Sequence, residues 1–226
     1  MRKMMKIWIT VVIALAYLGG SQTALWAATT VTGTPVIYQI TLHQIRVYNQ
    51  DNGTWYVAGT GDLTFDIAST GAGTAVGNYI SGASLATGTY TQVEVTMSRT
   101  FGIKAVILDT PGTLGNSNSY YNTTATSTSG AINCLRDGTP PFDGVGYATG
   151  TAVIPSGATL PATERIEGDY LIHTETLTTN IIVKEGETRT IRVSFDITNS
   201  ATFEQVVFNI AVCYPSPPAI TITQIE

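Results

Sequence analysis

The sequence predicts an all-β fold, an antiparallel two-sheet sandwich of the immunoglobulin-like or Greek-key kind. Apolar and polar residues alternate in many short segments, and a period of two with one apolar face is typical of half-buried strands. About ten such segments follow one another, with turn residues between them. No segment after the N-terminal leader combines a 3.6-residue period with capping residues, so little helix is expected. A single β-barrel is the alternative architecture.

Residues 1–27 have the features of a secretory signal peptide. Three basic residues precede an apolar run over residues 7–18, which is too short to span a bilayer comfortably, and small residues before Ala28 offer a cleavage site. We therefore predict a secreted protein of the cell surface, with residues 28–226 as one domain that does not insert into a membrane after cleavage. An uncleaved N-terminal anchor helix is the alternative.

The charge of the chain limits its partners. The leader holds three of the eleven basic residues and none of the sixteen acidic ones, so the rest of the chain has a net charge of −8. Nucleic acids and anionic lipids are bound by basic surfaces. The sequence therefore predicts no nucleic-acid partner.

In the N-terminal half, strands are expected at residues 36–48, 54–58 and 62–67, with a hairpin turn at 49–53 that contains Asn-Gly. A short strand is expected at residues 79–85. A long strand, bent or divided near Gly102, is expected over residues 90–107. Its core-facing side chains would be Val93, Val95, Met97, Phe101, Ile103 and Ile107.

The most regular alternation lies in residues 177–214, which we expect to form three antiparallel strands. In the last of them, over residues 203–214, the expected core-facing side chains are Val206, Phe208, Ile210, Val212 and Tyr214. Prolines then stop the pairing, because proline has no backbone donor. The tail at residues 219–226 alternates again. It is either an edge strand of its own domain or a donor strand for a neighbour, through Ile220, Ile222 and Ile225.

Residues 109–146 are rich in Gly, Asn, Ser, Thr and Pro, so we expect a long insertion there. Cys134 lies in the insertion and Cys213 in the last strand, and two cysteines in an exported chain predict a disulfide. Two buried free thiols are the alternative. Cys213 has the opposite parity to the expected core-facing residues Ile210 and Val212, so its side chain should point away from the core. The insertion that carries Cys134 is therefore expected to cross the outer face or edge of that strand.

No catalytic pattern stands out, and we expect no enzyme. There are two histidines, His43 and His173, and no G-x-S-x-G elbow. Glycosidase carboxylates pair in space rather than in sequence, so a hydrolase stays a minor alternative. Its candidate residues are strand carboxylates, which we expect instead to lie on solvated faces: Asp62, Asp66, Glu94 and Asp196.

Candidate ligand sites are few. No Cys or His cluster has zinc spacing. Asp137 and Asp143, each followed by Gly, are the best candidates for calcium, and no other cofactor is expected. Trp55, Tyr120 and Tyr121 are candidate glycan-binding residues, because each belongs to an adjacent aromatic pair that cannot place both rings in the core.

Four segments carry a resemblance to a known family: YQITLHQIRVYNQDNGTWYVAG, LTFDI, LATGTYTQVEVTM and NIIVKEGETRTIRVSFDIT. In these segments the chain resembles an uncharacterised domain family of exported bacterial and archaeal surface proteins. The resemblance implies a β-sandwich at the cell surface and no particular activity. The chain departs from the family by lacking a lipoprotein cysteine and by carrying the 109–146 insertion. In composition and strand number it is also similar to filament subunits that polymerise by strand donation.

These observations predict an exported structural protein that associates with itself. We expect a subunit of an extracellular filament, pilus or surface assembly, with an adhesive or scaffold role, built by strand addition between subunits. The donor would be the N-terminal arm at residues 28–35 or the C-terminal tail. The alternative is a secreted glycan-binding module that uses the 109–146 insertion.

Overall fold

The computed structural model describes residues 30–69, 85–110, 112–115, 117–137, 147–185, 190–207 and 210–225. The predicted signal peptide and nearly all of the strand predicted at residues 79–85 lie outside this part of the chain. The described residues form an all-β fold of fifteen strands in three antiparallel sheets, and none of them is helical. The prediction of an antiparallel all-β fold is therefore confirmed.

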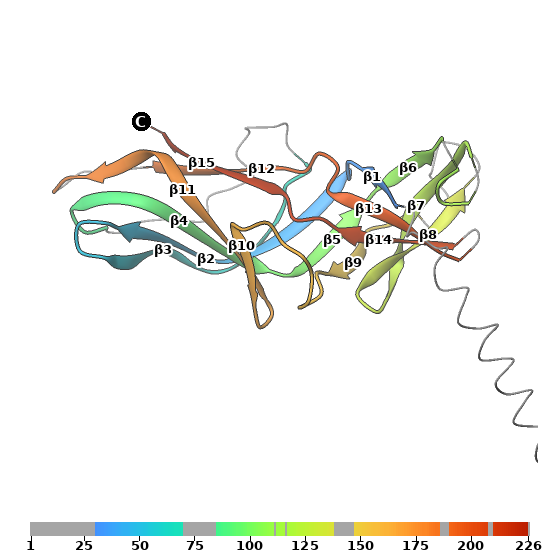
Figure 1. Cartoon of the computed structure of the whole chain (residues 1–226), viewed down its shortest axis with the longest axis horizontal. Coiled ribbons are helices and arrows are strands. Elements are labelled where there is room, and N and C mark those ends of the chain that lie inside the picture. The colour runs from blue at the N-terminus through green and yellow to red at the C-terminus, as the bar shows by residue number, and fades with distance from the viewer. Residues whose placement is uncertain are drawn as a thin grey trace, which may run out of the picture.

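Sheet B is the larger half of the elongated molecule (Figure 1). Its strand order is β10-β11-β4-β2-β5-β9, and β3 pairs with the other edge of β2. Because β4 and β5 share one edge of β2, this strand runs through most of the sheet. The strands are β2 (Ile37–Asn49), β3 (Thr54–Asp66), β4 (Gly88–Ser98), β5 (Thr100–Lys104), β9 (Gly150–Val153), β10 (Glu164–Glu167) and β11 (Tyr170–Val183).

Sheet A has the order β1-β13-β14-β8-β7-β6 and is curled almost into a barrel. Its end strands β1 and β6 approach each other so closely that a Cβ atom on Gly33 would lie 3.3 Å from Cδ1 of Ile107. The strands are β1 (Thr30–Gly33), β6 (Val106–Asp109), β7 (Ser119–Thr128), β8 (Ala131–Asp137), β13 (Ala201–Val207) and β14 (Ile210–Pro215).

Sheet C consists of β12 (Thr190–Asp196) and β15 (Ala219–Ile225), which pair along seven residues. Ile220 and Ile222 of β15 are buried in the core. The C-terminal tail is therefore a strand of its own domain in this structure. Figure 1 shows sheet C lying over the end of sheet B where β11 finishes.

One hydrophobic core runs through all three sheets. The ring of Tyr38 packs edge-on against Phe101, with ring centroids 5.5 Å apart, and its hydroxyl donates to the carbonyl of Ser216 at 2.7 Å. This bond ties the first strand of sheet B to the segment between β14 and β15. The predicted core-facing side chains of residues 90–107 are confirmed, since all except the half-buried Ile107 are fully buried.

The predicted hairpin turn at residues 49–53 is confirmed. β2 and β3 pair up to Asn49 and Thr54, and Gly53 has a positive φ of 69°. Residues 90–107 are divided among β4, β5 and β6, with breaks at Arg99 and Ala105 rather than at Gly102.

Three predictions for the C-terminal half are wrong. Residues 177–214 do not form one three-stranded unit, because their strands are divided among sheets B, C and A. Residues 203–214 lie in the hairpin β13–β14, with a register shift between Gln205 and Val207, and the residues of this hairpin in the core have the parity opposite to the predicted one. Val206 and Ile210 are more than half exposed, while Phe203, Ala211 and Cys213 are buried in the core. Of the other predicted side chains, Val212 is buried, Tyr214 is half-buried and Phe208 lies outside the described residues.

In the predicted insertion at residues 109–146, the described residues are largely in regular structure. Its described part supplies β7 and β8, which complete sheet A. β8 pairs with β14 along the sheet, so the segment does lie beside the strand of Cys213, within the plane of the sheet rather than across its outer face.

Candidate functional site

The face of sheet B that points away from the core carries a continuous band of polar and aromatic side chains. Strand registers place Arg46 opposite Glu94, Glu94 opposite Thr174, and Tyr48 opposite both Trp55 and Gln92. The alternating residues Val47, Val93 and Val95 are fully buried on the other face. We call this band the polar face, made up of Tyr48, Trp55, Arg46, Gln92, Glu94, Thr174, Arg165 and Glu167.

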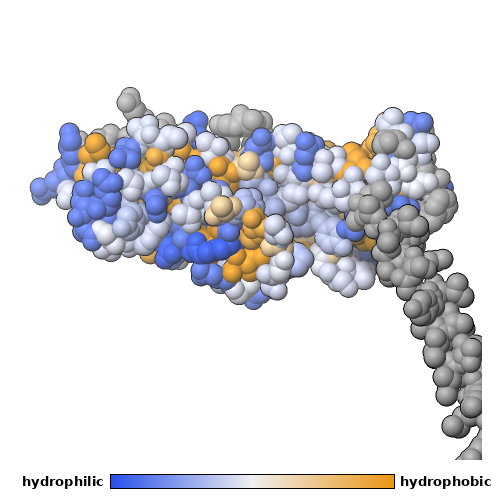
Figure 2. Space-filling model, in the orientation of Figure 1, coloured by the Kyte–Doolittle hydropathy of each residue, from blue (hydrophilic) through white to orange (hydrophobic). Residues whose placement is uncertain are grey.

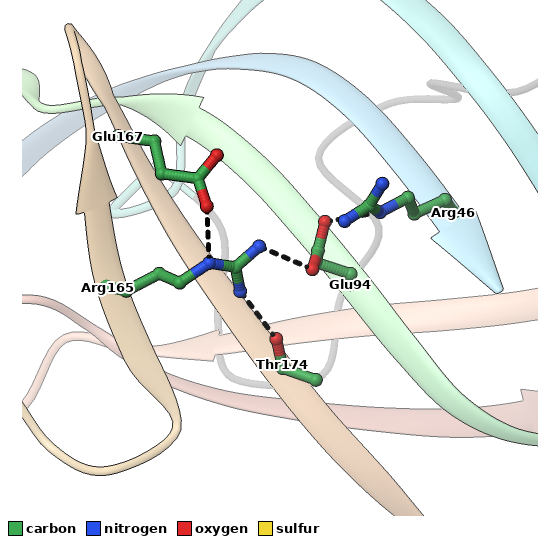
Figure 3. Close-up of polar contacts among 5 residues, drawn as sticks. All are labelled: Arg46, Glu94, Arg165, Glu167 and Thr174. Atoms are coloured by element: carbon green, nitrogen blue, oxygen red, sulfur yellow. Dashed lines mark hydrogen bonds and ion pairs between the residues drawn. The ribbon is translucent and has the colours of Figure 1, made fainter. Parts of the chain in front are cut away.

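Glu94 is the centre of the polar face (Figure 3). Its side chain is 4% exposed, which is unusual for a carboxylate on the outside of a sheet. Arg46 Nε lies 2.5 Å from Oε1 and Arg165 Nη2 lies 2.9 Å from Oε2. The two guanidinium groups therefore cover the carboxylate from both sides and balance its charge.

Arg165 is held by two further residues of the same cluster. Its Nε donates to Glu167 at 2.7 Å and its Nη1 donates to the hydroxyl of Thr174 at 3.2 Å. Together with the bond to Glu94, these contacts engage all three nitrogens of the guanidinium group and leave two of its five N–H groups without a partner in this cluster. The hydrogen bonds that Arg165 donates to Glu167 and Glu94 raise its pKa, so its charge is fixed at any physiological pH.

The pKa of Glu94 results from two opposing effects. Burial would raise it, but the hydrogen bonds and charges of Arg46 and Arg165 outweigh burial and hold the pKa below the ordinary value of 4.5. Glu94 is therefore ionised at neutral pH. A carboxylate in this state is a poor proton donor, so the cluster is built for charge pairing rather than for general acid catalysis.

Trp55 lies at the end of the polar face near the β2–β3 hairpin. Its ring is half-buried and packs against Tyr48, with ring centroids 5.3 Å apart, while the guanidinium carbon of Arg46 lies 4.9 Å from the indole centroid. A second aromatic position lies at the other end of the face. There Tyr170 is 42% exposed and packs edge-on against His43 at 4.6 Å, and His43 also contacts Asp62.

A second ionisable cluster lies on the inner side of sheet B. His173 is 5% exposed, and its Nδ1 and Nε2 atoms lie 3.5 Å from Glu164 and Glu175 respectively. Neither ring nitrogen has a hydrogen-bond partner among the described residues. Sequence reasoning missed this cluster, although His173 has the same parity along β11 as Leu171 and Leu177, which marks it as a residue on the apolar side of the strand.

The remaining strand carboxylates have local structural roles. Asp66 accepts hydrogen bonds from the backbone N–H groups of Tyr38 and Ala68. Asp196 accepts one from the backbone N–H of Thr198, and this bond, with the Thr198 side chain, lowers its pKa.

The predicted disulfide is not formed, and Cys134 and Cys213 are both buried free thiols. They lie on the adjacent strands β8 and β14, in diagonal positions, since Cys134 is opposite Ala211 and Cys213 is opposite Ile132. The hydrogen bond with Cys213, together with burial, raises the pKa of the Cys134 thiol. The wrong parity predicted for residues 203–214 explains why an outer-face bridge was expected.

Neither thiol should react with the reagent DTNB while the protein is folded, because burial excludes the reagent and the neutral thiol is a weak nucleophile. We expect both thiols to react after denaturation without any reductant. Rapid reaction of the folded protein would contradict the buried arrangement. Fewer than two reactive thiols in the denatured chain would show that a disulfide forms after all.

The predicted glycan-binding tyrosines of the 109–146 segment are separated by burial. Tyr121 is fully buried and donates a hydrogen bond to the carbonyl of Leu114 at 2.7 Å, so its ring cannot stack on a sugar. Tyr120 is half-buried on the opposite side of β7. Of the three predicted aromatic residues, Trp55 is the one that lies within a larger polar surface.

The calcium prediction gains no support from geometry. The side chain of Asp137 and all of Asp143 lie outside the described residues. In the part of the chain that the structure describes, no three His, Cys, Asp or Glu side chains form a group suited to a metal ion. Nor do those residues include a helix long and apolar enough to cross a membrane.

The first and last strands of the described chain, β1 and β15, lie at the edges of sheets. β1 is the outermost strand beside β13 and pairs with it over four residues, from Thr30 opposite Glu204 to Gly33 opposite Ala201. β15 pairs with β12 over seven residues, with Ile225 opposite Thr190.

Comparison of the chain with family models, with curated protein sequences and with solved structures finds no match in any of the three.

Proposed function

We propose that the protein is an exported subunit of an extracellular filament or surface assembly, built by strand addition between copies of the chain. The observation that carries the proposal is the place of β1. It is the first described strand, it pairs with β13 alone, and it occupies the gap between β13 and β6 in the nearly closed sheet A. A strand in this position can be supplied by the same chain or by a neighbouring copy with the same hydrogen bonds.

The geometry favours β1 over the C-terminal strand as the donor. β15 makes nearly twice as many register pairs as β1 and buries Ile220 and Ile222 in the core. In β1, Val31 is partly buried against the core and Gly33 is buried, so few apolar contacts are lost when the strand leaves. The proposal includes a two-sheet immunoglobulin-like or Greek-key architecture for the subunit, supported by the common core of the antiparallel sheets.

Deletion of residues 28–35 should convert assemblies of the purified protein into single subunits, as seen by negative-stain electron microscopy. The truncated chain exposes the edges of β13 and β6, so it should bind a synthetic peptide of residues 28–35. A control peptide with Val31→Asp should bind at least tenfold more weakly, because Val31 packs against the core.

The outcomes of this experiment separate the parts of the proposal. If the intact protein forms no assemblies visible by negative-stain electron microscopy over a range of protein concentration, salt and pH, the filament function is contradicted. Assemblies that persist after deletion of residues 28–35 would contradict donation by β1. Equal binding of the two peptides would show that the gap between β13 and β6 does not select the strand.

A further inference from the structure

The polar face of sheet B has a composition that strand addition does not explain. It lies on the outside of the sheet and is formed by β10, β11, β4, β2 and β3, whereas β1 belongs to sheet A. We propose that this face binds a neutral polysaccharide chain. The inference does not depend on assembly of the protein into filaments.

Aromatic rings at both ends of the face supply stacking positions. Trp55 is fixed by Tyr48 and Arg46 at the hairpin end, and Tyr170 is fixed by His43 at the other end. Thr176, which lies in the row of Tyr48 and Gln92, is six residues from Tyr170 along β11, or about 20 Å at 3.4 Å per residue. Trp55 lies in the same row on β3, opposite Tyr48, so about 20 Å is the separation of the two rings along the strand direction. Ring platforms so far apart suit an extended chain better than a single small molecule.

Hydrogen-bonding groups fill the space between the rings. Arg46, Arg165 and Thr174 come from three different strands and are brought together by Glu94 and its neighbours (Figure 3). Glu94 holds both guanidinium groups in one orientation, so less side-chain entropy is lost when a ligand binds. Gln44, Gln92 and Thr96 add amide and hydroxyl groups in the adjoining rows.

The charges favour a neutral ligand. Within the face, the two positive charges of Arg46 and Arg165 are balanced by Glu94 and Glu167. The chain beyond the predicted leader has a net charge of −8, which opposes an acidic polysaccharide. On the side of the molecule that Figure 2 shows, hydrophobic residues form separate patches among hydrophilic ones.

Affinity electrophoresis tests the proposal in native gels that contain hydroxyethylcellulose, xylan, mannan, dextran or soluble starch, with alginate as the acidic comparison. We expect the protein to be retarded by at least one neutral polymer and not by alginate. Trp55→Ala and Tyr170→Ala should each weaken the retardation about tenfold, the upper range for loss of one aromatic contact.

Tyr120→Ala is the matched control, because Tyr120 is a half-buried tyrosine on sheet A, outside the polar face. It should retain full retardation. Thermal unfolding of each variant shows that the fold is intact. No retardation by any neutral polymer would overturn the proposal, and so would retardation that Trp55→Ala and Tyr170→Ala leave unchanged. Loss of retardation in Tyr120→Ala alone would place the site on sheet A instead.

Discussion

Replacement of Gly150 by alanine should lower the free energy of unfolding by about 3 kcal/mol, the upper range for overpacking of a core. Gly150 is the first residue of β9, where a strand of sheet B passes directly over β7 and β8 of sheet A. A Cβ atom there would lie well inside the 3.0 Å limit of real Cβ contacts, against both the side chain of Ile132 and the backbone carbonyl of Thr124.

The clash in this variant cannot be relieved by a side-chain rotation alone. Ile132 is fully buried, and the carbonyl of Thr124 can move only with its strand. We therefore expect β9 to be pushed away from β7 and β8, which separates the two sheets locally and lowers the urea midpoint of unfolding.

Gly157→Ala is the control for this substitution. Apart from its chain neighbours, no described residue has a heavy atom within 4 Å of the added Cβ, so the variant should unfold at the wild-type midpoint or slightly above it. Equal midpoints for Gly150→Ala and Gly157→Ala would show that the contact between the two sheets is looser than the structure indicates.

Glu94→Gln should lower the free energy of unfolding by about 2–3 kcal/mol at pH 7. Removal of one partner from a buried ion pair costs roughly 3–5 kcal/mol, and the effect is smaller here because the side chains of Arg46 and Arg165 are 33% and 41% exposed. Glu167→Gln is the matched control. Glu167 also pairs with Arg165, but its side chain is 61% exposed, so the change should stay within about 0.5 kcal/mol.

The pH dependence of stability provides an independent test of the same cluster. The folded-state pKa of Glu94 lies below the unfolded value of 4.5, so its contribution is complete above pH 4.5 and is lost as the pH falls through the folded-state pKa. The difference in stability between wild type and Glu94→Gln should therefore shrink in acid. A difference that is constant from pH 7 to pH 3 would contradict the charge pairing.

Local pattern was sufficient to predict several strands and their buried sides. The alternation of Val93, Val95 and Met97 continues without a break, and the Asn-Gly turn after β2 fixes the register of the hairpin. The parity of β14 could not be predicted in the same way. The core side of this hairpin carries Phe203 and the small residues Ala211 and Cys213, whereas the larger apolar residues Val206 and Ile210 lie on the outer side, so hydrophobicity alone indicates the wrong face.

Contacts between distant segments were beyond the reach of sequence pattern. Glu94 was expected on an outer face and does lie there, but Arg46 and Arg165 cover it, so it is buried. Both arginines come from strands far away in the chain, which is why their contact with Glu94 was not predicted. For the same reason the sequence did not predict which sheet each strand joins. The prediction that residues 109–146 form an irregular insertion failed because Thr- and Ser-rich strands lack the apolar alternation that identifies other strands.

The pairing of β1 with β13 has a consequence for how the chain folds. Thr30 lies opposite Glu204, so sheet A joins the first described strand to one that follows it by more than 170 residues. Contacts between residues so far apart in the sequence form slowly, because a loop of more than a hundred residues must close first. Because the chain is synthesised from its N-terminus, β1 is made long before β13. During that interval the strand is available to another molecule, and kinetics rather than final stability decides which partner it meets first.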